Sequence, residues 1–331
     1  MEKRFDVFGM CNALFDLQAE VADTALSDLS LPKGGMFLLG HEEQRAIVPR
    51  VYSELVNAAA GGSGANTMHA LALLGGKACY TSRVGDDEHG RMYKQSLSEY
   101  GVQANLGESG EQTGISLILV TPDTQRTMCT YLGASQDLQA SDVNVEDLRA
   151  AHYIYVTGYL WDTPNQKEAV LKAMQEAKQA GVKVAFSLSD PFCVGRHKAE
   201  FTSLLSDYVD VVFANAEEAR GMTGLEDVTE AAQMLAKMTG GVAVVTRDKS
   251  GSLLVADEKT YEVPAFTVTA VDTTGAGDTY AAGVLYGLTQ NLPLDAAGRI
   301  GAYLAAQVVA KMGPRLDTID RAALDKAIQG T

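Results

Sequence analysis

From residue 151 to residue 312, short apolar segments alternate with longer segments that have helical periodicity. The apolar segments of strand length are His152–Val156, Val182–Leu188, Val209–Ala214 and Val242–Thr246. The main helical segments are 164–180, 228–238, 275–288 and 294–312. A crossover helix returns the chain to the same end of a sheet, so successive strands run parallel. We therefore predict an α/β fold with a central, mostly parallel sheet flanked by helices on both faces.

The N-terminal part of the chain begins with the same kinds of segment. Phe5–Gly9 and Ala78–Val84 have the composition of buried strands. Residues 63–74 follow a helical period that ends at a pair of glycines, which is a usual stop signal. Asp86 is placed to cap the helix that follows.

Two stretches interrupt this alternation and predict a second, smaller sheet. Residues 14–21 and much of 113–132 alternate apolar and polar side chains, as strands with one solvent-facing side do. They are far apart in sequence, so the small sheet would be built from insertions and not from a separate terminal domain. We predict one domain over residues 1–331, with a lid built from about 14–40 and 111–132.

The charge and the cysteines exclude several classes of partner and site. A net charge of −15 argues against binding of nucleic acid or of an anionic membrane surface, since both need a basic face. The four cysteines show no zinc-ligand spacing, so we expect reduced thiols. The N-terminal segment is too polar for a secretory signal, and no stretch approaches the roughly 18 apolar residues of a membrane span. We expect a cytoplasmic protein.

The segment VDTTGAGDTYAAG, residues 271–283, leads into a helix through small residues. Gly275, Ala276 and Gly277 permit a sharp turn, and the first-turn amides of the helix would then be free donors. Free amides and the positive end of the helix dipole form an anion site suited to a phosphoryl group. Asp278 lies in the same turn, where a carboxylate can accept the proton of an attacking hydroxyl. The plain alternative is an ordinary helix start with a first-turn acid.

The string DTTGAGD followed by a small-residue helix resembles the second signature of the ribokinase-like (PfkB) family of carbohydrate and nucleoside kinases. The resemblance implies a ribokinase-like fold and an ATP- and Mg²⁺-dependent kinase that phosphorylates a hydroxyl of a small molecule. It makes Asp278 the catalytic base and Gly275–Gly277 the anion site. It also suggests a monovalent cation, K⁺, near Asp272 and Thr274.

Two further segments resemble the acceptor side of that family. GGSGANT resembles its first signature, which places Gly62 and Asn66 at the acceptor's hydroxyls. The alternative for this segment is a simple helix N-terminus. GMCNALFD resembles the family's first strand followed by its substrate-binding aspartate, here Asp16, with Asn12 beside it. A carboxylate can accept two adjacent hydroxyls. Without the family match, Asp16 would be expected to face water on an alternating strand.

Two weaker motifs resemble the nucleotide-binding residues of the family. Asn215 and Glu218 match the family's N-x-x-E motif, in which the glutamate helps to organise Mg²⁺, here through water. A capped helix start explains the same residues. Thr246 and Gly251 match the family's T-x-G-x-x-G near the nucleotide, but Asp248 replaces the first glycine. That replacement leaves the detailed backbone contact open.

The predicted lid and a strand end supply the remaining candidates. Arg126 resembles a lid arginine that closes over the phosphates, and an exposed strand arginine is the alternative. Tyr159 follows a predicted strand and is expected to contact the acceptor. A purine needs flat apolar surface, which Tyr159 with Phe15, Met36 and Phe37 would offer unless they fill the lid's own core.

The acceptor is predicted from a subfamily resemblance. The Asn12/Asp16 pair and the segments LPKGGM and SLSDPFCV resemble bacterial family members called adenosine kinases. The favoured reaction is therefore in-line phosphorylation of adenosine to AMP at its 5′-hydroxyl, as in purine salvage. A sugar kinase acting on ribose or fructose stays open. We expect a monomer or a homodimer.

Other function classes are disfavoured by missing motifs. The chain has no G-x-x-x-x-G-K-[ST] and no G-x-G-x-x-G after the first strand, which argues against a P-loop enzyme and a nicotinamide-dependent oxidoreductase. A ligand-binding relative without activity is also disfavoured, because loss of the base would be expected and Asp278 is present.

Overall fold

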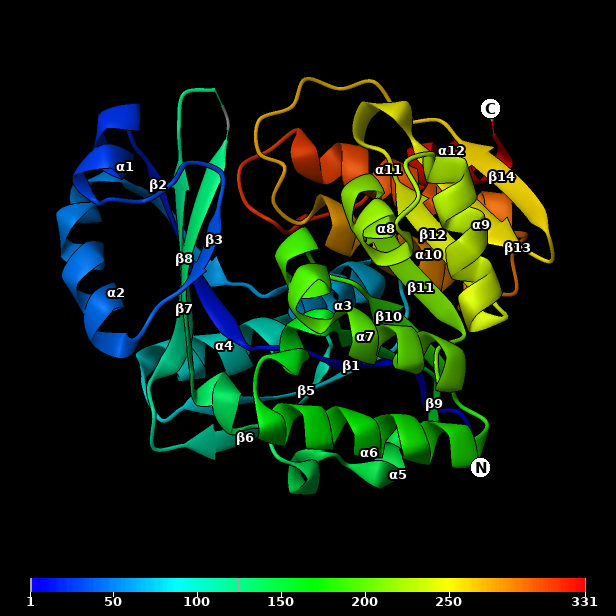
Figure 1. Cartoon of the computed structure of the whole chain (residues 1–331). Helices are drawn as coiled ribbons and strands as arrows, with labels where there is room; N and C mark the ends of the chain where they lie inside the picture. The colour runs from blue at the N-terminus through cyan, green and yellow to red at the C-terminus, as the bar shows by residue number, and fades with distance from the viewer. Residues whose placement is uncertain (1, 124, 331) are drawn as a thin grey trace.

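The computed structural model describes residues 2–123 and 125–330, which form a nine-stranded and a five-stranded sheet (Figure 1). Residue 124, within the predicted lid range, lies outside the described residues. The large sheet has the order β14 (Lys259–Val263), β13 (Ser252–Ala256), β12 (Val242–Thr246), β11 (Val211–Asn215), β10 (Lys183–Ser187), β9 (Ala151–Thr157), β1 (Phe5–Met10), β5 (Ala78–Gly85) and β6 (Gln103–Ser109). Strands β6 to β12 along this order are parallel, and β12, β13 and β14 pair antiparallel. The predicted α/β fold with a mostly parallel sheet is confirmed.

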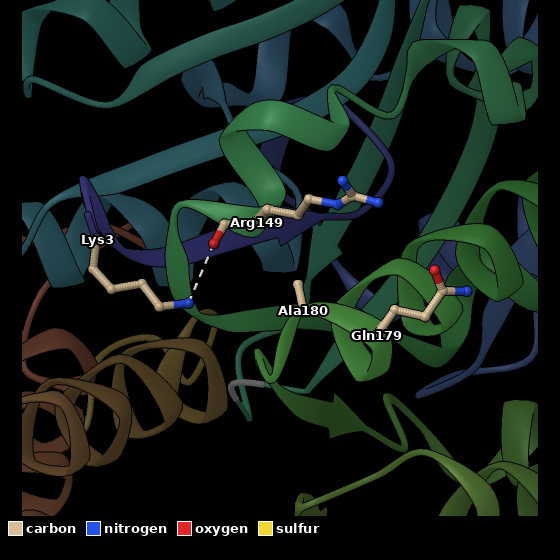
Figure 2. A pocket seen from close by; sticks show the side chains of 4 residues that line it. All are labelled: Lys3, Arg149, Gln179 and Ala180. Carbon is tan, nitrogen blue, oxygen red and sulfur yellow. Dashed lines mark hydrogen bonds between the residues drawn. The ribbon is translucent and has the colours of Figure 1, made fainter. Parts of the chain in front are cut away.

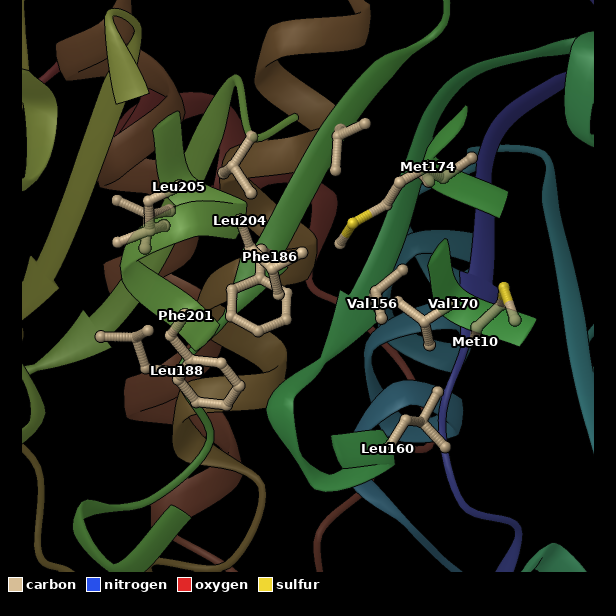
Figure 3. Close-up of a cluster of buried hydrophobic side chains, with 14 of the residues drawn as sticks. Met10, Val156, Leu160, Val170, Met174, Phe186, Leu188, Phe201, Leu204 and Leu205 are labelled. Atoms are coloured by element: carbon tan, nitrogen blue, oxygen red, sulfur yellow. The ribbon is translucent and has the colours of Figure 1, made fainter. Parts of the chain in front are cut away.

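Helices cover both faces of the large sheet because its strands are apolar on both sides. In β9, Ile154 and Val156 join the core on one face, part of which Figure 3 shows, whereas Tyr155 joins the core on the other. The first face is covered by α5 (Val145–Arg149), α6 (Pro164–Ala180), α7 (Pro191–Asp207), α8 (Ala216–Thr223) and α9 (Val228–Thr239). The second is covered by α3 (Ser63–Leu73), α4 (Glu88–Glu99), α10 (Ala276–Thr289) and α11 (Leu294–Val309). Two-sided burial explains why the strands are continuous apolar runs.

The two Ala- and Gly-rich helices α10 and α11 pack backbone against backbone. A Cβ on Gly283 would lie 2.5 Å from the backbone nitrogen of Gly301, and one on Gly287 would lie 2.5 Å from the Cβ of Ala297. Small side chains are therefore required along this contact. The C-terminal helix α12 (Arg321–Gln329) adds to the outer side of α11 through a separate apolar cluster. This packing fixes the start of α10, where the sequence places the anion site.

The five-stranded sheet projects beside the main body (Figure 1). Its order is β3 (Met36–Leu38), β8 (Arg126–Gly133), β7 (Thr113–Val120), β2 (Leu14–Glu20) and β4 (Leu55–Ala60). One face is apolar and lies under α1 (Asp23–Asp28) and α2 (His41–Ile47), whereas Asp16 and Gln18 of β2 alternate with its apolar residues. Strand β4 lies outside the two predicted ranges, because LVNAAA carries no clear strand pattern.

One predicted helix cap is wrong by one position. Asp87, not Asp86, is the N-cap of α4, and its Oδ1 accepts from the backbone N–H of Gly90 at 2.8 Å. Its Oδ2 also accepts from the N–H of Thr113 at 2.7 Å, so Asp87 ties α4 to β7 of the small sheet. The helix begins at Glu88, and Asp87, directly before it, has the extended backbone that a cap needs.

No helix among residues 2–123 and 125–330 is both long and apolar enough to cross a bilayer.

We predict that alanine at Gly251 costs far more stability than alanine at Gly181. Both glycines have positive φ, +83° and +65°, which strains any L-residue by about 1–2 kcal/mol. Only at Gly251 would the added Cβ meet backbone, at 2.1 Å from the carbonyl oxygen of Val263; nothing lies within 4 Å at Gly181. In urea denaturation, Gly181→Ala should lower the free energy of unfolding by about 1 kcal/mol and Gly251→Ala by at least about 3 kcal/mol. Equal losses would contradict this interpretation.

Candidate active site

The residues singled out from the sequence lie at the carboxyl ends of the parallel strands. Asn12 follows β1, Tyr159 follows β9, and Asn215 and Thr246 end β11 and β12. In open α/β sheets this edge is where ligands bind. Helix α10 begins at the same region, so the strand ends, the small sheet and one helix N-terminus surround a common site.

The start of α10 has the geometry of an anion site. Gly275, the N-cap, has a φ of +78°, and a Cβ there would lie 2.4 Å from the carbonyl oxygen of Pro314. Among the described residues, the backbone N–H groups of Gly277 and Asp278 have no acceptor, and that of Ala276 makes only a 3.4 Å bond to a loop carbonyl. Free donors at the positive end of a helix bind phosphate well.

Asp278 sits in the first turn of α10, facing the start of α3. Its Oδ2 accepts a hydrogen bond of 3.0 Å from Nδ2 of Asn66. Burial raises the pKa of Asp278 to about 6, and hydrogen bonds from Asn66 and Ser63 oppose this rise. A carboxylate with a pKa near the working pH can take a proton from a hydroxyl and release it afterwards. The geometry thus agrees with a base beside an anion site.

Arg126 connects the small sheet to the anion loop. It lies at the beginning of β8, and its Nη1 donates to Oγ1 of Thr274 at 3.0 Å. Its positive charge also lowers the pKa of Asp278. The guanidinium is therefore directed inward, and a phosphate held on α10 would lie within its field.

Asp16 is a buried carboxylate that has no hydrogen-bond partner in the described part of the chain. Its side chain comes from β2 of the small sheet and only 4% of the residue is exposed. Burial raises the pKa of Asp16 to about 7, the charge of Arg315 opposes this, and the carboxylates of Asp278 and Asp272 add to it. A Cβ on Gly61 would overlap this carboxyl group at 2.0 Å, which explains the glycine before α3.

The predicted acceptor residues Asn12 and Gly62 form a fixed backbone corner. Gly62 has a φ of +83°, and a Cβ there would lie 2.5 Å from the carbonyl oxygen of Asn12. The Asn12 side chain is already bonded, since its Oδ1 accepts from Gln166 at 2.7 Å and its Nδ2 donates to the Tyr159 carbonyl at 3.4 Å. The Tyr159 hydroxyl donates to the carbonyl of Ser189 at 3.2 Å. These contacts hold the wall of the site.

Arg315 is a residue of the site that sequence reasoning missed. It lies in the loop after α11, and its Nε donates to Oδ1 of Asn66 at 2.8 Å. Its charge opposes the effect of burial on the pKa values of Asp16 and Asp278. No motif marks Arg315, and the only hint was an arginine placed after a Gly-Pro pair at the end of the last long predicted helix.

Asn215 and Glu218 form a capping box at the start of α8, the structural alternative that the sequence left open. Oε2 of Glu218 accepts from the N–H of Asn215 at 3.0 Å, and its Oε1 accepts from Nδ2 of Asn215 at 2.5 Å. Burial raises the pKa of Glu218 to about 7. With both oxygens engaged by Asn215, this carboxylate suits an outer contact through water more than direct ligation of an ion.

Thr246 and Asn215 are register partners at the ends of β12 and β11, so the two nucleotide motifs are adjacent. Gly251 has a φ of +83°. Asp248, which replaces the usual glycine, has a φ of +48°, the left-handed region that glycine adopts without strain. The position therefore keeps a glycine-like backbone despite the side chain. A cavity of about 410 Å³ adjoins this loop and α8, lined in part by Arg247, Asp248 and Ser250.

Asp272 is saturated with hydrogen bonds. Its Oδ1 accepts from the N–H and the hydroxyl of Thr274 at 2.9 and 2.6 Å, and its Oδ2 accepts from Gln18 at 2.9 Å and from the Gly313 N–H at 3.0 Å. Among the described residues, no group of three or more His, Cys, Asp or Glu side chains is arranged for a metal ion. Asp272 thus shapes the anion loop, and the K⁺ site near it stays a prediction.

A second cavity, of about 350 Å³, lies at the opposite edge of the sheet (Figure 2). The cavity is lined by Lys3, Arg149, Gln179 and Ala180. Nζ of Lys3 donates a hydrogen bond to the carbonyl oxygen of Arg149 at 3.2 Å. These residues precede β1 and β9 or end α6, so they lie at the amino ends of the strands, away from Asp278.

Comparisons with known proteins agree with this geometry. Residues 42–321 match the family described as pfkB family carbohydrate kinase. The crystal structure of a probable sugar kinase from Rhizobium etli CFN 42 superposes with a TM-score of 0.93 at 36% identity, covering 99% of both chains. The adenosine kinase of Sinorhizobium meliloti superposes with a TM-score of 0.90 at 35% identity, covering 99% of this chain and 100% of that one. Fructokinase-1 of Zea mays is 34% identical over 69% of this chain and 73% of its own length.

We predict that Asp16→Asn stabilises the unliganded protein at neutral pH. The folded-state pKa of Asp16, about 7, lies above its ordinary 3.8, so wild-type stability is lost as pH rises between these values. The variant should match the wild type near pH 4 and exceed its free energy of unfolding at pH 8 by up to about 4 kcal/mol. The exposed Asp325→Asn should show no such difference in urea denaturation at the two pH values. A pH-independent effect of Asp16→Asn would contradict the assignment.

Proposed function

The chain belongs to the pfkB family of carbohydrate kinases, and from this premise we propose that it uses ATP to phosphorylate the 5′-hydroxyl of adenosine. As a member of that family it is an ATP- and Mg²⁺-dependent kinase for a sugar or a nucleoside. The proposal concerns which hydroxyl compound is the acceptor and which residues act on it.

The observation that carries the acceptor proposal is the carboxylate of Asp16, which makes no hydrogen bond within the described residues although only 4% of the residue is exposed. Its oxygens are not among the fully buried atoms that lack a partner, so they are open to the site, where a largely desolvated charge without donors is costly. Two adjacent hydroxyls donating to the two carboxylate oxygens would remove that cost. Ribose carries such a pair at its 2′ and 3′ positions, which leaves the 5′-hydroxyl to reach toward Asp278. Asn12, Gly62 and Asn66 would complete the polar side of this site.

The residues at the start of α10 support direct transfer. Asp278 accepts the proton of the acceptor's hydroxyl. The hydroxyl oxygen forms a bond to the γ-phosphorus, and the bond between that phosphorus and the ADP oxygen breaks. The amides of Gly275, Ala276, Gly277 and Asp278 hold the transferred group, and Arg126 adds positive charge from the small sheet. Because Arg126 belongs to β8, we propose that the small sheet acts as a lid that closes over the acceptor and excludes water.

The nucleotide would be held along the ends of β11 and β12. Asn215, Thr246 and Gly251 supply polar and backbone groups there, and Glu218 suits Mg²⁺ through water. Bound Mg²⁺ supplies charge neutralisation at the phosphates. A monovalent cation such as K⁺ would use backbone carbonyls near Asp272 and Thr274, because the Asp272 carboxylate is already saturated.

Adenosine as the acceptor is supported by the similarity to the Sinorhizobium meliloti adenosine kinase over almost the whole chain and by the Asn12/Asp16 pair. Phe15 takes the alternative that the sequence left open: it is 2% exposed, lies in the apolar cluster of the small sheet and stacks on His89 of α4 with 4.5 Å between ring centroids. Met36, Phe37 and Tyr159 remain partly exposed and available to a purine. A sugar acceptor such as ribose or fructose is the second candidate, supported by the probable sugar kinase of Rhizobium etli and the maize fructokinase.

We predict that Asp278→Asn lowers kcat at least ~100-fold, the scale of one general base, while the thermal unfolding temperature and ATP binding change little. Loss of the proton acceptor leaves the amides of α10 in place, so the nucleotide site is retained. Turnover should be measured as ADP release in the presence of the acceptor. Near-normal turnover in this variant would rule out Asp278 as the base.

We predict that adenosine is a far better substrate than ribose and that Asp16→Ala abolishes most of its turnover. The variant removes both acceptor oxygens for the ribose diol, so kcat/KM for adenosine should fall by at least ~100-fold, about 3 kcal/mol. Glu20→Ala serves as a comparison, because Glu20 is the exposed last residue of the same strand. Efficient turnover of fructose or ribose with no reaction of adenosine would instead establish a sugar kinase.

A further inference from the structure

The loop between α11 and α12 reaches back into the active site at residues 313–315. The N–H of Gly313 donates to Oδ2 of Asp272 at 3.0 Å. The carbonyl oxygen of Pro314 lies so close to Gly275, the N-cap of α10, that a Cβ there would be 2.4 Å from it. Arg315 follows directly and is partly buried. One short segment therefore contacts the anion loop, the helix start and the neighbourhood of the base.

The guanidinium of Arg315 is held from three sides. Its Nε donates to Oδ1 of Asn66 at 2.8 Å, its Nη1 donates to Oγ of Ser96 at 2.9 Å, and its Nη2 donates to the carbonyl of Gly61 at 3.5 Å. Ser96 belongs to α4, whereas Gly61 and Asn66 flank the start of α3. These contacts leave the guanidinium little freedom to turn.

The donor and acceptor inventory then fixes the amide of Asn66. Arginine only donates, so the Asn66 atom that faces it must be the oxygen. The Asn66 nitrogen must consequently face Asp278, where it donates to Oδ2 at 3.0 Å. An Asn66 turned by 180° would lose both bonds and set its oxygen against a carboxylate.

We propose that Arg315 is a positioning residue, which locks the Asn66 amide so that its N–H donates to one oxygen of Asp278 and fixes the direction of that carboxylate. The inference rests on the proposed role of Asp278 as base. Through Asn66, Arg315 sets both the direction and the ionisation of that base without touching the reacting atoms.

The charges around the base agree with this role. Positive groups near Asp278 are Arg126 from the small sheet and Arg315 from the C-terminal loop, and both lower its pKa against the effect of burial. Asp16 is the neighbouring carboxylate from β2. The other titratable side chains that interact with Asp278 are Cys11, Tyr155 and Tyr159, from the ends of β1 and β9. Loss of Arg315 would leave two carboxylates with one cation.

The test compares Arg315→Met, Arg315→Gln and Arg321→Met, using ATP and an acceptor that the wild type phosphorylates. Methionine removes the charge and the donor, whereas glutamine can still donate to Asn66 but is neutral. The control residue Arg321 donates to backbone carbonyls at the C-terminal end of α3, away from Asp278. We expect Arg315→Met to lower kcat at least ~10-fold with the KM for ATP within twofold. The acid limb of its kcat/KM profile should move up by about one pH unit, since loss of a nearby cation raises a carboxylate pKa.

Arg315→Gln should show the shifted acid limb with a smaller loss of kcat, and Arg321→Met should match the wild type. Wild-type kcat and an unshifted acid limb in Arg315→Met would overturn the inference. If that variant does not fold, an unshifted limb in Arg315→Gln would overturn it equally. Asp278→Asn separates the two proposals: if it is inactive while the Arg315 variants behave as wild type, only the role of Arg315 fails. If Asp278→Asn stays active, the proposed base fails first.

Discussion

The hydrogen bond between Asn66 and Asp278 joins two helix N-termini, and the rest of the site is arranged around it. Asn66 belongs to α3 and Asp278 to α10, and these helices pack on the same face of the large sheet. Glycine is required at both helix starts, because a Cβ on Gly62 would collide with the carbonyl oxygen of Asn12 and one on Gly275 with that of Pro314. The closeness of the two helix ends therefore places the proposed base, the anion site and the proposed acceptor residues next to one another.

This arrangement concentrates buried carboxylates in a way that opposes stability. Burial raises the pKa values of Asp16 and Glu218 to about 7 and that of Asp278 to about 6. At neutral pH the folded protein thus holds charges that burial disfavours, and ligands that donate hydrogen bonds or bring positive charge would relieve this. The positive charges of Arg126, on the small sheet, and Arg315, in the C-terminal loop, offset part of the unfavourable free energy of burying these carboxylates. Such local conflicts are common where a site is built for chemistry.

The sequence predicts the parts of the fold that follow from periodicity and local geometry. The alternation of strand and helix segments after residue 151 predicted the parallel sheet. The small residues before Asp278 predicted the start of α10. Strands β4 and β6 carry no clear alternation, and the antiparallel pair β13–β14 was not anticipated within the parallel pattern. Arg315 could not be predicted because its partner Asn66 is 249 positions away, and only tertiary packing brings them together. Phe15 shows the same limit, since its apolar character suited both a ligand and the lid core.

The central claim is that Asp278 faces the hydroxyl that receives the phosphoryl group while Asp16 holds the other end of the acceptor. A crystal structure with adenosine and a non-hydrolysable ATP analogue tests both at once. We predict a 5′-oxygen within hydrogen-bond distance of Asp278 and about 3–3.5 Å from the γ-phosphorus, with the 2′- and 3′-hydroxyls donating to Asp16. An acceptor whose hydroxyls avoid Asp16 and whose nearest oxygen lies away from Asp278 would contradict it.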